Sequence, residues 1–474
     1  MEDDPAMQAN SEKLSGSDGP MRTSKMTSIR VRPHAYIAAL FVLIFFSSLF
    51  FYLQIELLAI ALVIFGIIFI PLLAVTDRIV FNGKRLYRSG LLPRTWAYLS
   101  GTRFWLRPRD TEQVETSINL VMKKGGRVYF RYETVVRGNG QTFYLNSGGE
   151  EYRKLAREFL RSLPDEVLDA NSIEIRDYAG NPKELRQLVR NSDIPSPEVL
   201  VTSFKSVDAK WLRSAGNPDS SDSEALSDKA GRLQLLGNQL KYSGSLLQAL
   251  ESFRRAAKIR PRDPRLLFDF ARCLHYFALA ERDTRLERKA AAMMRLSERY
   301  AGKDADLLSR LGETYFQIGE WGRAGNVFKK ALEEAGEHFR SIRGMAELAL
   351  RDGRLAHVVH NFSLASRSAG TPSIRKWSSA EADYFSRLND DDEYLEMELG
   401  RVNLLDSLTR WRRSLLRFTV LGFPVILIGT YFNDLMITNV GWIVSGVSLS
   451  LWCILSISRR MFTERIAADL LDEE

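Results

Sequence analysis

Long apolar runs alternate with polar segments along the chain, and the runs gather near its two ends. Residues 34–76 and 414–458 each contain two apolar stretches separated by a short polar loop. A helix of about 18 residues spans roughly 27 Å, enough to cross the hydrocarbon core of a membrane. The polar leader, residues 1–33, and the immediate second stretch disfavour a cleaved signal peptide. The pattern therefore predicts a transmembrane helical hairpin near each end.

Basic residues lie on the outer flanks of both predicted hairpins, and the loops inside the hairpins contain no Lys or Arg. The positive-inside rule then assigns both termini and the whole central segment to the cytoplasm, in a multi-pass protein of a bacterial inner (plasma) membrane. Trp411, Arg412 and Arg413 form an aromatic and basic cluster at the expected membrane surface, where anionic lipids would hold it. The tails, residues 1–33 and 459–474, are polar, and the first is expected to be disordered.

The overall composition is that of an ordinary globular protein. Charged residues make up 26% and hydrophobic residues 45% of the 474 residues. A net charge of +8 would suit a nucleic-acid partner, but the positive residues cluster beside the apolar runs. Membrane topology and lipid headgroups explain that clustering better, so nucleic acid is not an expected partner.

Residues 77–163 change to a pattern with a period of two. Two apolar–polar runs around the turn Asn82-Gly83 predict a β-hairpin, and further runs separated by Gly-rich turns continue it. An amphipathic helix over residues 150–161 follows. We expect a small β-rich domain with a C-terminal helix, and we interpret residues 164–229 as a linker that ends in an acidic, serine-rich run.

The segment 230–372 repeats one pattern of small and large apolar residues at a period of about 34 residues. Two copies match at the same offsets, the first with Leu233, Leu236, Gly237, Leu240, Ala249, Phe253, Ala256 and Pro261, and the third with Leu308, Leu311, Gly312, Tyr315, Ala324, Phe328 and Ala331. Small residues permit close approach of two helices and large ones fill the surrounding space, which is typical of an α-solenoid. The second copy carries an insertion near residues 282–288, and residues 373–413 are expected to form capping helices.

These repeats resemble tetratricopeptide repeats. The resemblance covers residues 230–372 and implies stacked helix pairs whose first helices line a concave, protein-binding face. Residues 77–163 resemble the bacterial pleckstrin-homology-like domains that follow paired spans, through their order of elements and the motif Tyr87-Arg-Ser-Gly-Leu-Leu-Pro. This second resemblance implies a small barrel capped by a helix. The expected fold class is therefore mainly α with a smaller β-rich domain, both held between two transmembrane hairpins.

The tetratricopeptide resemblance assigns one side of each first helix to the concave face. The candidate partner-binding residues there are Asn238, Lys241, Arg265, Arg272, His275, Phe316, Arg340, Arg343 and Arg351. Positive groups outnumber the negative Asp306, Glu313 and Glu347, so charge complementarity favours an acidic or carboxylate-ended segment. For any single side chain, a role as solvated surface is the alternative.

No phosphate-binding loop, nucleophile elbow or zinc-protease motif occurs in the sequence. His357 and His360 have the best metal-like spacing, but no nearby ligand completes a site, and helix-surface histidines are expected. The two cysteines cannot form a disulfide framework. We expect no enzymatic activity, no cofactor and no metal.

The expected function is a membrane-anchored, non-enzymatic scaffold that recruits a protein or peptide partner through the concave face. One alternative is a structural subunit of an envelope-biogenesis or secretion complex, assembled through the hairpins, where Gly422, Gly429, Gly441 and Gly446 would permit close helix packing. A second alternative is a membrane enzyme with an unrecognised carboxylate site.

Overall fold

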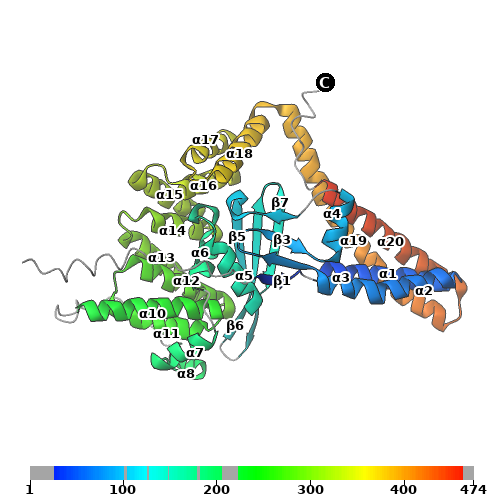
Figure 1. Cartoon of the computed structure of the whole chain (residues 1–474), viewed down its shortest axis with the longest axis horizontal. Helices are drawn as coiled ribbons and strands as arrows, with labels where there is room; N and C mark the ends of the chain where they lie inside the picture. Colours follow the sequence, from blue (N-terminus) through cyan, green and yellow to red (C-terminus); the bar gives the residue numbers. More distant parts are fainter. Residues whose placement is uncertain are drawn as a thin grey trace, which may run out of the picture.

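Three regions make up the fold in the computed structural model: a bundle of apolar helices, two small antiparallel sheets and a curved array of paired helices (Figure 1). The structure describes residues 26–31, 33–100, 104–124, 127–147, 149–178, 182–204 and 223–462. The sheets lie between the bundle and the array (Figure 1). After one short strand, the chain runs from the bundle to the sheets, then to the array, and returns to the bundle. The disorder expected before residue 26 falls outside the described residues.

The two apolar blocks form the bundle. The first block contains α1 (His34–Tyr52), α2 (Glu56–Ile64), the π-helical turn η2 (Phe65–Phe69) and α3 (Ile70–Thr76). The second contains α19 (Asp392–Tyr431) and α20 (Leu435–Met461). Four helical segments in the described part of the chain are long and apolar enough to cross a membrane. The two hairpins contact each other, because Tyr52 donates a hydrogen bond to Asn439 at 2.6 Å.

Helix α19 joins the array to the bundle without a break. The sequence predicted capping helices and then a separate span, but one helix of 40 residues, about 60 Å long, covers both. Neither Gly nor Pro occurs between Arg401 and Leu421, so no residue there ends the helix at the polar–apolar boundary. The array is therefore tied rigidly to the second hairpin.

The β-rich region contains two antiparallel sheets. The first has the order β1 (Thr27–Arg30), β2 (Arg78–Phe81), β3 (Leu86–Ser89) and β4 (Trp105–Leu106). The second has the order β5 (Gln113–Lys124), β6 (Arg127–Gly138) and β7 (Gln141–Ser147). The predicted turn joins β2 to β3, with Gly83 at a φ of 80° and the Asn82 side chain accepting from the Arg85 N–H at 2.8 Å.

Strand β1 corrects the expectation that residues 1–33 form a disordered tail. Thr27 pairs with Phe81 and Arg30 with Arg78, so the whole first hairpin is inserted between two neighbouring strands. A strand of 4 residues carries too little alternation to be recognised when its partner lies beyond two apolar helices.

Helix α5 (Glu150–Arg161) matches the predicted helix and packs on the sheets, with the Phe159 and Phe81 ring centroids 5.3 Å apart. A further helix, α4 (Leu91–Ser100), lies between β3 and β4 and was not predicted.

The array is built from α10 (Ser223–Ser243), α11 (Leu246–Ile259), α12 (Pro264–Glu281), α13 (Thr284–Tyr300), α14 (Ala305–Gln317), α15 (Trp321–Ala335), α16 (Phe339–Arg351), α17 (Leu355–Ser368) and α18 (Pro372–Asp390). The predicted small–large contacts are present, since a Cβ on Gly237 would lie 2.8 Å from the Phe253 ring and one on Gly312 would lie 2.5 Å from Phe328. The insertion in the second copy lengthens its helices to 18 and 17 residues, against 13 and 15 in the third.

Residues 164–229 are more than a linker. They contain α6 (Ala170–Tyr178), α7 (Pro182–Asn191) and α8 (Pro197–Phe204), and residues 205–222 lie outside the described residues. Leu185 of α7 and Leu200 of α8 are buried in the core of the array. Helix α6 lies in the concave face of the array, between it and β5 (Figure 1). The linker prediction failed because α6 is short and buries both polar and apolar residues on several sides, which gives it no helical period.

Candidate functional site in the concave face

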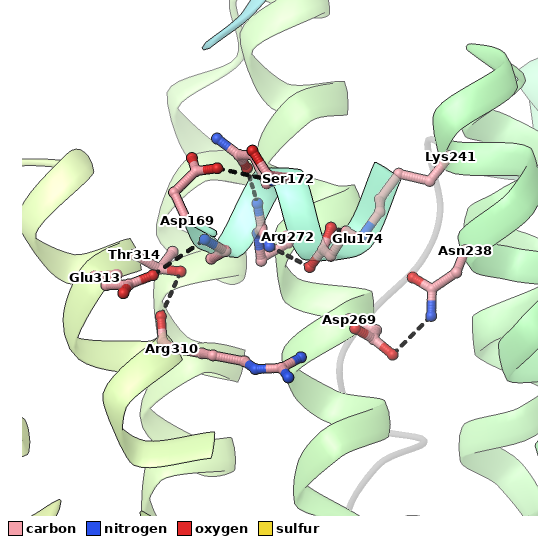
Figure 2. A network of polar contacts seen from close by, with 12 residues as sticks. Asp169, Ser172, Glu174, Asn238, Lys241, Asp269, Arg272, Arg310, Glu313 and Thr314 are labelled. Atoms are coloured by element: carbon pink, nitrogen blue, oxygen red, sulfur yellow. Dashed lines mark hydrogen bonds and ion pairs between the residues drawn. The ribbon is translucent and has the colours of Figure 1, made fainter. Parts of the chain in front are cut away.

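Glu174 of α6 is the centre of a buried polar cluster formed with α10 and α12 (Figure 2). Lys241 Nζ lies 2.9 Å from Glu174 Oε2, and the Arg272 guanidinium pairs with the other carboxylate oxygen. The Tyr242 hydroxyl also donates to this carboxylate. The Glu174, Lys241 and Arg272 side chains are at most 3% exposed. We call these four residues the concave cluster.

The pKa of Glu174 is held at about 2 by this cluster. Burial alone raises the pKa of a carboxyl group, but the charges of Arg272 and Lys241 and the hydrogen bonds from Tyr242 and Lys241 outweigh that effect. The carboxylate is therefore ionised at every physiological pH. Removing it would leave two cations buried without a counter-charge.

The start of α6 is fixed by the cap residue Asp169. Its carboxylate accepts the N–H of Ser172 at 2.8 Å and that of Thr116 in β5 at 3.2 Å, which joins the helix to the sheet. Burial raises the pKa of Asp169 to about 6, although these hydrogen bonds oppose the shift. Ala170 N–H donates to Glu313 at 3.2 Å, so α14 also holds this end.

Two predicted groove arginines, both on α16, contact groups of the same chain near α6. Arg340 donates to the carbonyl oxygens of Asp165 and Leu168, each at 3.1 Å. Arg343 lies 2.9 Å from Glu347 in its own helix and 3.4 Å from Glu115 in β5. Both guanidiniums thus bind groups of the same chain.

The remaining predicted groove residues also have neighbours within the array. Asn238 is buried and donates to Asp269 at 2.8 Å, and Arg265 pairs with Asp304 at 2.9 Å. The Arg351 guanidinium stacks 3.2 Å from the centroid of the Trp321 ring. His275 and Phe316 are half-buried, and burial lowers the pKa of His275.

These contacts correct the interpretation of the concave face as an open basic groove. The sequence predicted an acidic segment bound by Lys241, Arg272 and Arg340, and α6 with its preceding loop is such a segment, within the same chain. The charge argument for an acidic external partner loses its basis, because these cations are buried and already bind groups of the same chain. Glu174 was missed because it lies between two isoleucines in a stretch interpreted as linker, although a carboxylate in an apolar stretch is itself a signal for a buried ion pair.

One part of the concave face stays open. A cleft of about 440 Å³ lies beside α6, lined by Glu115, Thr116, Ser117, Ile118, Asp169, Asn171, Tyr276, Glu313, Phe316, Gln317, Phe328, Arg340, Arg343, Gly344 and Glu347. Its lining contains four carboxylates and two guanidiniums, so it is not basic. Arg340 Nη1 is buried there with no hydrogen-bond partner among the described residues. Of the predicted residues, the cleft brings together only Phe316, Arg340 and Arg343.

The predicted membrane-surface cluster lies within the continuous helix α19. Trp411 is 65% exposed and Arg413 is exposed, so contact with lipid remains a prediction for both. Within the residues that the structure describes, no group of three or more His, Cys, Asp or Glu side chains is arranged to hold a metal ion.

Comparisons with known proteins give distant structural likenesses. No protein-family model matches the chain, and no curated protein matches it. The chain is similar to the crystal structure of MamA, with 16% identity, coverage of 33% of this chain and 85% of that chain, and a TM-score of 0.26. It is also similar to the crystal structure of the APC/C hetero-tetramer Cut9-Hcn1, with 10% identity, coverage of 67% and 56% of the two chains, and a TM-score of 0.28.

Proposed function

We propose that the protein is a membrane-anchored, non-enzymatic scaffold that recruits a protein partner through the open cleft beside β5. Four long apolar helices support the anchoring. The pairing of β1 with β2 supports a hairpin topology, because it requires both flanks of the first hairpin to lie on one side of the membrane. The basic outer flanks support the cytoplasm of an inner membrane as that side.

Hydrogen bonds between the edge of β5 and another segment of the same chain support the proposal. The Asp169 N–H donates to the Val114 carbonyl at 3.1 Å, and the Asn171 side chain donates to the Thr116 carbonyl at 2.9 Å. Leu168 forms a parallel bridge with Val114. The first half of this edge thus already binds an extended segment, supplied by the loop before α6.

The second half of the same edge is free to bind in the same way. Alternate residues of a strand direct their backbone groups to the same side, so Ile118 and Leu120 face the edge that Val114 and Thr116 use. Their edge-facing N–H and C=O groups have no hydrogen-bond partner among the described residues. A partner segment in extended conformation would pair there and contact Phe316 across the cleft.

The β-rich region fits this role as an interaction module. It contains two sheets of 4 and 3 strands followed by α5, and its likeness to pleckstrin-homology-like domains stays a prediction. Such folds bind proteins as readily as lipids, so the fold alone does not choose the ligand.

The two other functions receive less support. In the second hairpin, a Cβ on Gly441 would lie 2.7 Å from Ile426 and one on Gly429 would lie 2.5 Å from Thr438, so these glycines serve packing within the hairpin rather than assembly with other subunits. An enzymatic role would require a carboxyl group with a shifted pKa in a cleft. Asp169 is the candidate, because it lines the cleft and its pKa is raised to about 6. Its role as the cap of α6 accounts for that burial.

A proline in β5 tests the proposal. Ile118→Pro removes one edge-facing N–H and keeps the bonds to β6, because proline is tolerated where the N–H points away from the ladder. A photoreactive residue in place of the exposed Gln317 would cross-link the partner in membranes, and Ile118→Pro should reduce the yield about tenfold.

Two controls accompany this test. Ile118→Val keeps the N–H and should leave the yield unchanged. A photoreactive residue in place of Lys329, exposed on the outer helix α15, should not capture the same partner. Equal capture from both positions, or full capture with Ile118→Pro, would contradict the proposal.

A further inference from the structure

A second cleft lies where the β-rich region meets the helix bundle. It measures about 710 Å³ and is lined by Asn82, Arg85, Tyr87, Arg88, Ser89, Pro93, Arg94, Ala97, Tyr98, Phe104 and Trp105. This lining contains three cations and four aromatic rings but no carboxylate. An adjoining hollow of about 680 Å³ shares Arg85 and adds Lys84, Arg107 and Arg109. The two hollows together form the membrane-side cleft.

One of the cations is already paired and has a structural role. Arg88 makes two hydrogen bonds to Asp77, at 2.8 and 2.5 Å, and Asp77 is fully buried at the end of α3. This pairing raises the pKa of Arg88. It fixes β3 to the end of the first hairpin and leaves Arg88 little capacity for a ligand.

Arg109 lies 3.6 Å from Asp110, but three other cations of the cleft have no carboxylate partner among the described residues. Arg85 and Arg107 lie over the Trp105 ring, 4.6 and 5.0 Å from its centroid, which holds both guanidiniums in place. Among the described residues, Arg85, Arg94 and Arg107 form no ion pair with a carboxylate. Positive charges fixed without counter-charges favour an anionic ligand.

The position of the cleft relative to the bundle defines the source of that anion. Helix α4 lies at the end of the bundle nearest the sheets (Figure 1). Gly90, just before α4, approaches the last turn of α3 so closely that a Cβ would lie 2.9 Å from the Thr76 carbonyl. Leu91 and Leu92 at the start of α4 are 40% and 41% exposed, as expected for side chains that enter the apolar edge of a bilayer.

We propose that the membrane-side cleft binds the phosphate-bearing headgroup of an anionic phospholipid from the leaflet that faces the sheets. Arg85 and Arg94 bind the phosphate, Trp105 and Tyr98 pack against the glycerol region, and Leu91 and Leu92 contact the acyl chains. The proposal rests on the proposed membrane anchoring and is independent of the partner site beside β5.

Photo-labelling of the full-length protein in lipid nanodiscs tests this assignment. The discs contain phosphatidylcholine with a minor fraction of phosphatidylglycerol that carries a diazirine near its headgroup, and mass spectrometry maps the labelled peptides. We expect label on the peptides that contain residues 84–107, and about a tenfold loss in Arg85→Gln/Arg94→Gln. The matched control, Arg186→Gln/Arg190→Gln, removes the same charge from α7, at the opposite end of the molecule in Figure 1, and should keep full labelling.

Three results would overturn the proposal. The first is equal labelling of the two double variants. The second is equal labelling of these peptides by a matching phosphatidylcholine probe. The third is displacement of the probe by millimolar inorganic phosphate but not by chloride at the same ionic strength, which would assign the cleft to free phosphate. Arg94→Glu is a second variant. Because Arg94 has no ion pair among the described residues, this variant should keep the fold, and its labelling reports binding alone.

Discussion

Two groups of basic side chains in this molecule differ in whether their charge is available. In the concave cluster, where the sequence predicted ligand binding, Lys241 and Arg272 are buried and both pair with Glu174 of the same chain. The membrane-side cleft, which the sequence did not single out, contains Arg85 and Arg94 without any carboxylate among its described lining residues. Positive charge in a sequence therefore indicates a ligand only once the chain's own carboxylates have been located. The same chemistry that would bind a partner can serve to join two regions of one chain.

The largest effect is expected from breaking the concave cluster. Glu174→Ala leaves Lys241 and Arg272 buried without a counter-charge, which should lower the free energy of unfolding by about 3–5 kcal/mol. Denaturant titration of the detergent-solubilised protein measures this. Glu150→Ala, which breaks the exposed pair with Lys154, should cost less than about 0.5 kcal/mol and serves as the control. Similar losses of unfolding free energy in the two variants would mean that the concave cluster does not hold α6 in the array.

A smaller effect, which depends on pH, is expected from Asp169. Its pKa is raised from 3.8 to about 6, so the folded state favours its protonated form. Its contribution is present at low pH and is lost as the pH rises from about 4 to 6, by up to about 3 kcal/mol. Asp169→Asn should flatten this part of the stability curve, measured by denaturant titration at several pH values. An unchanged slope would show that Asp169 titrates normally.

The contribution of Glu174 has the opposite sign. Its pKa is lowered from 4.5 to about 2, so its stabilisation is complete above its ordinary pKa and is lost as the pH falls below about 4. The two carboxyl groups can therefore be separated by pH in one experiment.

The smallest effect on stability is expected at the membrane-side cleft. Arg94 has no carboxylate partner among the described residues, so Arg94→Gln should change the free energy of unfolding by no more than about 0.5 kcal/mol. The same denaturant titration measures it. A large loss would mean that Arg94 holds the fold together, and would remove the contrast with the concave cluster.

Features that depend on neighbours in sequence were predictable, and features that depend on distant partners were not. The Asn82-Gly83 turn and the contact of Gly312 with Phe328 follow from local rules, and both are present. Strand β1 exists only because Phe81 lies opposite Thr27. Helix α6 likewise has no period of its own and is stabilised by charges from two other helices.

The sequence predicted which residue types line the candidate site, but not that a segment of the same chain fills it. Lys241, Arg272 and Arg340 do line the concave face, as the repeat pattern indicated, and they bind an acidic segment. That this segment belongs to the same chain could not be inferred, because loop closure over about a hundred residues costs little and leaves no mark in the sequence. The membrane-side cleft was missed because its cations lie in separate elements: Arg85 in the turn before β3, Arg94 in α4 and Arg107 after β4.

Strand β1 also has a consequence for biosynthesis. It is made before the first hairpin, whereas its partner β2 is made after it. Under the proposed membrane topology, β1 stays unpaired during translation until both apolar helices have been synthesised. The sheet then forms only if these helices return the chain to the side on which β1 remained. We therefore expect that a nascent chain whose first hairpin inserts with only one crossing cannot complete this sheet.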